Sequence, residues 1–306
     1  MNPNILKSTR LLNDIISQAK YFGCKVKIEM IMHKAGAWPL ARIVDTRPGL
    51  DNGIFLLTAG IHGTEIAGPL TVHQRLPEIL ACARVAGLQL VSYPLMNPSS
   101  FDNRENKSSD PNIKPDRNID NDGGDAGSND FLRYRLPDGT WTWNLPIAYY
   151  GKDLDWRWSS DPAVGERQPA ETAVMHKFLI KEDWKNVGVA LDIHQDNLTH
   201  GTPAGAYQYP FGDVSRYNGI TEQISLLTTI LGNYDFRFNR DNPNDVVCSD
   251  QNGCIVQHDG SLSDLAYRIG VPHALTIETT GATELQTAIE VNMTWIRGLC
   301  KLANNP

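Results

Sequence analysis

The segment that decides the fold spans residues 54–65 and reads IFLLTAGIHGTE. Its first six residues form a short, continuous apolar run, and glycines bound this run at Gly53 and Gly60. A run of this length and composition indicates a strand that is buried on both faces. A helical pattern follows from Glu65 to about Cys82. A buried strand that leads directly into a helix is typical of an α/β sheet.

The apolar runs on either side of this segment continue the alternation between strands and helices. Strands are predicted over residues 25–30, 40–44, 88–95, 187–193 and 274–278, the first two as a hairpin. Helices are predicted over residues 8–21, 170–181, 223–231, 263–269 and 285–302. We therefore expect an α/β fold with a mixed, twisted central sheet and helices on both faces.

The size and charge of the chain narrow the possible functions. With 306 residues, of which 41% are hydrophobic, the chain is long enough to bury a substantial core as a single domain over residues 1–306. Its net charge of −7 argues against a surface for nucleic acid or anionic lipid, because both require clustered Lys and Arg. No apolar span approaches the length of a membrane helix. Nucleic-acid and membrane partners are therefore not expected, and the oligomeric state is left open.

A polar stretch interrupts the pattern between about residues 99 and 166, where Asn, Asp, Gly and Ser are frequent. We expect a long inserted loop here, and loops of this length inside a compact domain are usually functional or disordered. The tryptophans of the stretch indicate that its second half packs against the rest of the chain: Trp141, Trp143, Trp156 and Trp158.

The cysteines and the N-terminus bear on the compartment. The five cysteines are scattered and odd in number, which is typical of free thiols in a reducing environment. The alternative is a loop-closing disulfide between Cys248 and Cys254, which are the closest pair. The first ten residues lack the apolar core of a secretory signal. A cytoplasmic protein with free thiols is the expectation.

A His and a carboxylate lie where the first buried strand ends. His62 and Glu65 are three residues apart, and Gly63 allows the backbone to bend between them. The carboxyl ends of strands are where open α/β sheets bind ligands. The pair can therefore turn onto one cation, although a His-x-x-Glu pair alone is weak evidence, since most surface His and Glu are solvated.

A second strand ends in a second candidate ligand, His194, within the run LDIHQD of residues 191–196. Two His and one carboxylate with an open fourth position form the recurring catalytic zinc set. Either Asp192 or Asp196 is placed to accept the other ring N–H of His194. The alternative interpretation is a histidine that merely ends a strand.

A third strand carries a carboxylate, Glu278, inside the apolar run LTIE of residues 275–278. An unpaired Glu is costly to bury, so it needs either a partner or a chemical role. A carboxylate beside a metal-activated water has such a role, because it accepts the water's proton and passes it to a leaving nitrogen. The alternative is a salt bridge between Glu278 and an arginine.

In these motifs the chain resembles the zinc carboxypeptidase superfamily, which includes the succinylglutamate desuccinylase and aspartoacylase branch. The matching pieces follow the family's order: HGTE at 62–65, MNP at 96–98, LDIH at 191–194, DGSLSDLAYRIG at 259–270 and TIE at 276–278. The resemblance implies one zinc ion on His62, Glu65 and His194, with Glu278 as general base. It also implies that Arg104 polarises the scissile carbonyl and stabilises the oxyanion. The alternative for Arg104 is a solvated loop residue.

Two positions depart from the family's pattern. An Asn-Arg pair usually clamps the substrate's terminal carboxylate, whereas this chain reads DRNID at 116–120, which leaves Arg117 and Asn118 as the candidate substrate-binding residues. The family's flexible tyrosine has no counterpart before the DGS motif. His258 is the nearest side chain that can donate a hydrogen bond, and its alternative is an ordinary surface histidine.

The resemblance therefore favours a metallocarboxypeptidase that cleaves a C-terminal amide bond, with a peptide as substrate. Only one helix is expected after Glu278, whereas the desuccinylase branch continues into a β-rich domain. Two alternatives stay open. One is a deacylase or amidohydrolase that acts on a small N-acyl amino acid or a cell-wall peptide. The other is a metal-binding homologue without catalysis.

Overall fold

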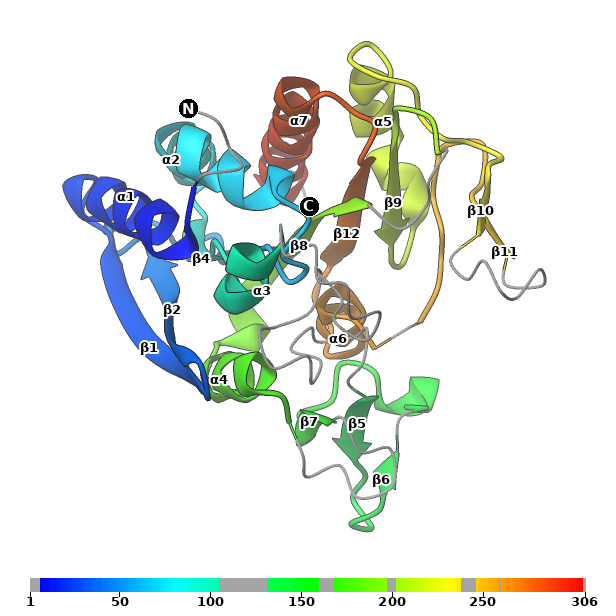
Figure 1. The fold of residues 1–306 in the computed structure, drawn as a ribbon. Helices are drawn as coiled ribbons and strands as arrows, with labels where there is room; N and C mark the ends of the chain where they lie inside the picture. The colour runs from blue at the N-terminus through cyan, green and yellow to red at the C-terminus, as the bar shows by residue number, and fades with distance from the viewer. Residues whose placement is uncertain are drawn as a thin grey trace.

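A seven-stranded mixed sheet forms the centre of the protein in the computed structural model (Figure 1). The structure describes residues 6–104, 131–142, 144–159, 168–196, 202–237, 246–258 and 260–304. In spatial order, the strands are β1 (Lys25–His33), β2 (Gly36–Val44), β4 (Gln89–Tyr93), β3 (Ile54–Ala59), β8 (Val187–Asp196), β12 (His273–Thr280) and β9 (Ala206–Pro210).

The four central strands, β4, β3, β8 and β12, run parallel to one another, and the outer strands join them antiparallel. Every residue of β3 is buried. A strand with helices on both faces must be apolar on both faces, which explains the continuous run in the sequence. The parallel arrangement brings the carboxyl ends of β3, β8 and β12 to the same edge of the sheet.

Helices cover both faces of the sheet, as predicted (Figure 1). One core cluster joins the sheet to α1 (Ser8–Tyr21), α2 (Ala67–Val85), α5 (Asn218–Ile224) and α7 (Leu285–Asn304). A second cluster, on the opposite face, includes residues of α4 (Ala170–Leu179) and α6 (Leu262–Arg268). The short helix α3 (Pro98–Asn103) follows β4. No described helix is long and apolar enough to cross a membrane.

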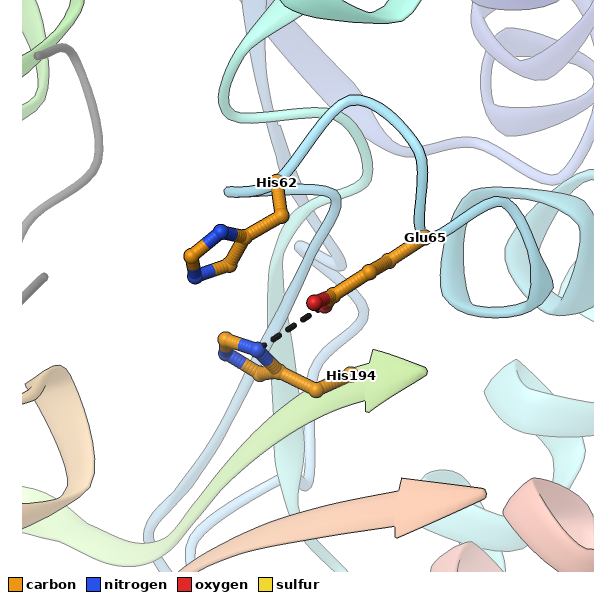
Figure 2. Close-up of side chains that lie close together, drawn as sticks. All are labelled: His62, Glu65 and His194. Carbon is orange, nitrogen blue, oxygen red and sulfur yellow. Dashed lines mark ion pairs between the residues drawn. The ribbon is translucent and has the colours of Figure 1, made fainter. Parts of the chain in front are cut away.

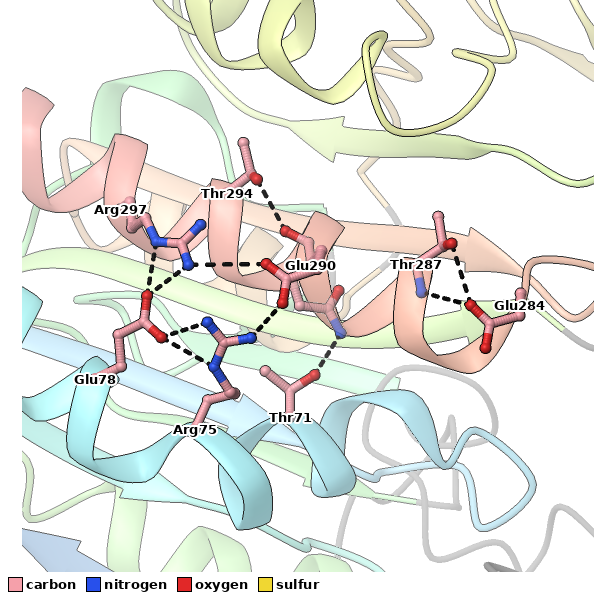
Figure 3. A network of polar contacts seen from close by, with 9 residues as sticks. Thr71, Arg75, Glu78, Glu284, Thr287, Glu290, Thr294 and Arg297 are labelled. Carbon is pink, nitrogen blue, oxygen red and sulfur yellow. Dashed lines mark hydrogen bonds and ion pairs between the residues drawn. The ribbon is translucent and has the colours of Figure 1, made fainter.

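A network of ion pairs ties α2 to α7 at the surface (Figure 3). Glu78 accepts hydrogen bonds from Arg75 Nε at 2.9 Å and from Arg297 Nε at 2.9 Å. Glu290 of α7 completes the network by pairing with Arg75. The network therefore ties α2, which follows β3 along the chain, to α7.

Most predicted elements are present within two or three residues of their expected ends, but the helix over residues 223–231 is wrong. The helix α5 ends at Ile224, and Ile230 forms a parallel bridge with Ala206 of β9. Leu226 is 84% exposed, so its apolar character does not mark a buried helix face. Residues 228–230 are β-branched and favour this extended pairing, which local periodicity did not reveal. The edge strand β9 was not predicted.

The stretch over residues 99–166 also differs from the long loop expected from its composition. Its described part contains α3, a turn of 3₁₀ helix at Ile147–Tyr149 and a small antiparallel sheet. The strands of that sheet are β5 (Phe131–Arg135), β6 (Trp141–Thr142) and β7 (Trp156–Ser159). Trp156 and Trp158 are 8% and 0% exposed, so the second half of the stretch packs against the rest of the chain, as predicted. Trp143 lies outside the described residues.

The remaining described strands form a two-stranded ribbon beside the main sheet, β10 (Asp235–Arg237) with β11 (Val246–Cys248). All five cysteines are free, which confirms the prediction of free thiols over a disulfide between Cys248 and Cys254.

Candidate metal centre

The candidate ligands come from the carboxyl ends of neighbouring parallel strands. His62 follows β3 by three residues, and His194 lies near the end of β8. In the register between these strands, Ala59 lies opposite Ile193. On the other side of β8, Glu278 of β12 lies directly opposite His194. Residues that are more than 80 positions apart in sequence therefore meet at one edge of the sheet.

Two glycines shape the loop that carries His62 and Glu65. Gly60 has a φ of +69°, and a Cβ atom there would lie 2.7 Å from Pro69 and 2.8 Å from Leu95. A Cβ atom at Gly63 would lie 2.1 Å from the backbone carbon of Ser100. The N–H of Gly63 also donates to Ser100 Oγ at 3.0 Å. The loop is thus held against α3, and only glycine fits at these two positions.

The side chains of His62, Glu65 and His194 converge on one point (Figure 2). Each offers one ligand atom, and these three atoms all lie within 4.8 Å of one another. His194 Nδ1 lies 3.0 Å from Glu65 Oε2. The same Glu65 oxygen accepts the backbone N–H of Gln195 at 3.2 Å, which orients the carboxylate. The structure therefore brings the three predicted ligands together.

Asp192 holds the other side of the His194 ring. His194 Nε2 lies 3.1 Å from Asp192 Oδ2, and the hydroxyl of Thr58 donates to Asp192 Oδ1 at 2.7 Å. Of the two carboxylates that the sequence left open, Asp192 is thus the one that contacts the ring. Burial lowers the pKa of His194, but the carboxylates of Asp192 and Glu65 outweigh it, so the pKa is well above its usual value.

Glu278 lies beside this cluster, with Oε1 3.8 Å from His194 Nδ1. The residue is 9% exposed, and its Oε2 atom has no hydrogen-bond partner among the described residues. Burial, with added repulsion from Glu65 and Asp196, raises the pKa of Glu278 well above its usual value against the attraction of His194. Because no described arginine pairs with it, the geometry does not support the salt-bridge alternative.

The donor set fits a divalent transition metal. Two imidazoles and one carboxylate form a three-ligand set that suits zinc and leaves a position open for water or substrate. The ring of His194 is backed by a carboxylate, as metal-bound histidines usually are. The Oε2 atom of Glu278 is a buried polar atom without a described partner, and a water molecule beside a bound metal would satisfy it.

Sequence reasoning missed Tyr207, which lies on β9 opposite Glu278 in the register with β12. The Tyr207 hydroxyl donates to Asp196 Oδ2 at 3.1 Å, and both residues are buried. Burial and the nearby Glu278 carboxylate raise the pKa of Tyr207 well above its usual value. The only signal for this residue is the alternation in AYQYP, which is short for a strand prediction.

Arg104 follows α3 at its C-terminal end. Its guanidinium donates to the backbone oxygens of Leu6, at 3.0 Å, and Phe101, and it lies 4.0 Å from the centre of the Phe101 ring. In this conformation Arg104 is held against α3 and the N-terminal segment. Its predicted role at the substrate carbonyl stays a prediction.

The remaining predicted residues differ in what the structure says of them. Arg117 and Asn118 lie outside the described residues, so their role stays a prediction. His258 is described: its Nδ1 lies 2.7 Å from Asp264 Oδ1, and its ring packs on Phe211 at 5.3 Å between centroids. These contacts place His258 in an aromatic cluster at the surface.

Comparisons with known proteins show that the fold of this chain is similar to that of several solved structures. No family model matches the chain, and no curated protein matches it. Among solved structures, a candidate metallopeptidase from Shewanella amazonensis is 18% identical with a TM-score of 0.61, and one from Shewanella baltica is 15% identical with a TM-score of 0.63. Each match covers 96% of this chain and 92% of the other.

A metallo-carboxypeptidase from Pseudomonas aeruginosa, solved with (2-guanidinoethylmercapto)succinic acid, is 14% identical with a TM-score of 0.54. That match covers 96% of this chain and 68% of the other. These similarities extend over nearly the whole chain, so the resemblance predicted from the sequence motifs is confirmed for the fold. The chain has the fold of the metallo-carboxypeptidases.

Proposed function

We propose that this protein is a zinc-dependent metallocarboxypeptidase that cleaves the C-terminal amide bond of a peptide. The observation that carries the proposal is the convergence of His62, Glu65 and His194 within 4.8 Å, beside the buried and partly unpartnered carboxylate of Glu278. A protein that only bound a metal would have no need of that carboxylate. The fold shared with metallo-carboxypeptidases supports the same chemistry.

Each residue of the site has a distinct role in this proposal. His62, Glu65 and His194 would hold a zinc ion, which would supply Lewis-acid activation of a water molecule. Glu278 would accept a proton from the attacking water and deliver it to the leaving nitrogen of the scissile amide. Asp192 orients the ring of His194 through Nε2, which would leave Nδ1 as the ligand atom for a metal.

Arg104 is the proposed donor to the oxyanion that develops on the scissile carbonyl. To act there, its guanidinium has to exchange the backbone oxygen of Leu6 for the substrate. The two hydrogen bonds described for it are to the neutral carbonyls of Leu6 and Phe101, whereas a bond to an oxyanion is charge-assisted and stronger. Substitution by Ala is therefore expected to lower kcat by about 10²–10³-fold. Lys at this position, which keeps the charge, should restore part of that loss.

Arg117 and Asn118 are the proposed clamp for the terminal carboxylate of the substrate. The order of this pair differs from the family's Asn-Arg motif, so the requirement for a free carboxylate is a point that the substrate panel has to test. A metallocarboxypeptidase requires a charge-assisted fork on that carboxylate. A deacylase that uses the same metal centre acts on a small N-acyl amino acid, which carries the same free carboxylate but no peptide chain.

The proposal is tested by metal analysis followed by hydrolysis of a substrate panel. The purified protein should contain one zinc ion, and a chelator should abolish hydrolysis. Among C-terminally free peptides, C-terminally amidated peptides and N-acyl amino acids, the free peptides should be the ones cleaved. Preferential cleavage of the N-acyl amino acids would instead establish the deacylase.

The mechanism is tested with Glu278→Gln, and Glu222→Gln on the exposed surface of α5 is the matched control. Both variants lose one carboxylate. The first should keep its zinc and lose about 10²–10⁴-fold in kcat, whereas the control should be fully active. Equal activity of the Glu278 variant and the wild type, with metal retained, would contradict the assigned base.

A further inference from the structure

The strand β1 is one of the two edge strands of the main sheet, and β9 is the other (Figure 1). It runs for nine residues, Lys25–His33, and pairs with β2 along its whole length without a bulge. No other described strand pairs with its outer edge. Such an edge presents a row of backbone N–H and C=O groups that another strand can bind.

One face of β1 exposes a row of large apolar side chains. Ile28, Met30 and Met32 are 47%, 48% and 68% exposed. They alternate along the strand, so they project on the same face, and Val26 of that face packs against the cluster that contains α1. Only ten large apolar residues of the described chain are exposed, so three on one strand form a concentrated patch.

The other face of β1 carries charges of both signs. Lys27 and Glu29 pair with each other at 3.3 Å, and Lys177 of α4 reaches Glu29 at 3.2 Å. Lys27 is 55% exposed and Glu29 is 26% exposed, so both are within reach of a partner that approaches the edge. Ile31, the next residue on this face, is fully buried.

We propose that β1 pairs antiparallel with β1 of a second copy of the chain, about a two-fold axis at Ile28. In this register, Lys27 lies opposite Glu29 of the partner subunit, and the symmetry makes this ion pair twice. On the other face, Met30 lies opposite Val26 of the partner subunit. The apolar row thus becomes continuous across the interface, and the two sheets join into one.

The charges select this register over its neighbours. If the pairing of the two strands shifts by two residues in one direction, Glu29 lies opposite Glu29 of the partner subunit. If it shifts by two residues in the other direction, Lys27 lies opposite Lys27 of the partner subunit. Like charges directly opposite one another destabilise a strand pair, whereas opposite charges stabilise it. The register centred on Ile28 is the one of these three that makes two attractive pairs and no repulsive pair.

Lysines on an edge strand often serve the opposite purpose and keep other strands away. Two features of β1 distinguish it from such a guarded edge. An acidic residue stands beside the lysine at the spacing that makes the strand complementary to itself, and the opposite face is apolar and exposed. An isologous interface between two copies requires this kind of self-complementary surface.

The test measures the mass of the full chain by sedimentation velocity over a range of concentrations. The wild type should form dimers. Lys27→Glu places Glu opposite Glu in both pairs, and Glu29→Lys places Lys opposite Lys. Each variant alone should dissociate at a concentration at least about tenfold higher than the wild type. An equimolar mixture of the two variants should dimerise again, because every opposed pair is then Glu with Lys.

Lys25→Glu is the matched control, since it makes the same change of charge at a position opposite Ile31 of the partner subunit. It should dimerise like the wild type. Thermal unfolding of each variant establishes that it is folded. A wild type that stays monomeric at every concentration would overturn the proposal. So would a Lys25→Glu variant that dissociates like Lys27→Glu, or a mixture of the two single variants that stays monomeric.

Discussion

The Nε2 atom of His194 lies 3.1 Å from the carboxylate of Asp192, and the ring therefore presents its other nitrogen to Glu65. Asp192→Asn replaces an acceptor oxygen with a weaker amide and removes the charge that raises the basicity of the ring. We expect zinc affinity to fall about 10–100-fold, as for other carboxylates behind metal-bound histidines. Zinc titration in competition with a chelator measures the change.

Asp213→Asn is the control for this measurement. Asp213 is exposed and accepts hydrogen bonds from Ser215 at the start of a 3₁₀ turn, so it carries the same type of carboxylate outside the site. Its loss should leave zinc affinity unchanged. Equal zinc affinity in Asp192→Asn and the wild type would show that the ring is oriented by other contacts.

Gly63→Ala should loosen the loop that carries two of the ligands. The added methyl group would lie 2.1 Å from the backbone of Ser100, so either the loop or α3 has to move. A shift of that size separates His62 and Glu65 from His194, and zinc affinity and activity should fall together. Gly219→Ala is the control, because nothing lies within 4 Å of a Cβ atom there. If both variants bind zinc like the wild type, the close contact with α3 does not position the ligands.

Tyr207→Phe removes a buried hydroxyl that donates to Asp196 at 3.1 Å. The carboxylate loses a donor in a low-dielectric setting, and we expect the free energy of unfolding to fall by about 1–2 kcal/mol. Urea unfolding of the two proteins at pH 7 measures the difference. Tyr21→Phe, at a side chain that is 86% exposed, provides the control and should be neutral. An unchanged midpoint in Tyr207→Phe would mean that Asp196 is satisfied without the hydroxyl.

Acid should weaken the network between α2 and α7. Burial raises the pKa of Glu78, but the guanidinium groups of Arg75 and Arg297 outweigh it and hold the pKa below its ordinary value of 4.5. A carboxylate with a lowered pKa in the folded state stabilises the fold above its unfolded pKa. That contribution is lost as the pH falls through the lower, folded pKa.

The measurement compares Glu78→Gln with the wild type by urea unfolding at two pH values. At pH 7 the variant should be less stable by about 0.5–1 kcal/mol, because the network is partly exposed to solvent and each of its ion pairs is weak. At about pH 3 the difference should shrink, since protonation has begun to remove the same charge from the wild type. If the difference in the free energy of unfolding is the same at both pH values, it arises from packing and not from the charge of Glu78.

Much of the fold was predictable because its signals are local. The runs at 54–59, 187–193 and 274–278 are mostly apolar, and each forms a buried strand of the central sheet. Strands of this type lie parallel beneath helices, so their carboxyl ends meet. That rule alone places His62, His194 and Glu278 at the same edge of the sheet. The prediction that failed, at residues 225–231, concerns a segment that pairs through a bridge between Ile230 and Ala206, and its local periodicity does not show this distant partner.

The sequence by itself determined which residues lie at the ends of the buried strands, because local periodicity predicts where strands and helices alternate. Only the tertiary structure decided that Asp192 contacts the His194 ring, that Tyr207 lies opposite Glu278, and that Arg104 is held against α3. Register between strands and the direction of a side chain follow from packing between distant segments. For the same reason, β1 could be predicted as a strand from its sequence, but its place at the edge of the sheet, with an exposed apolar face, could not.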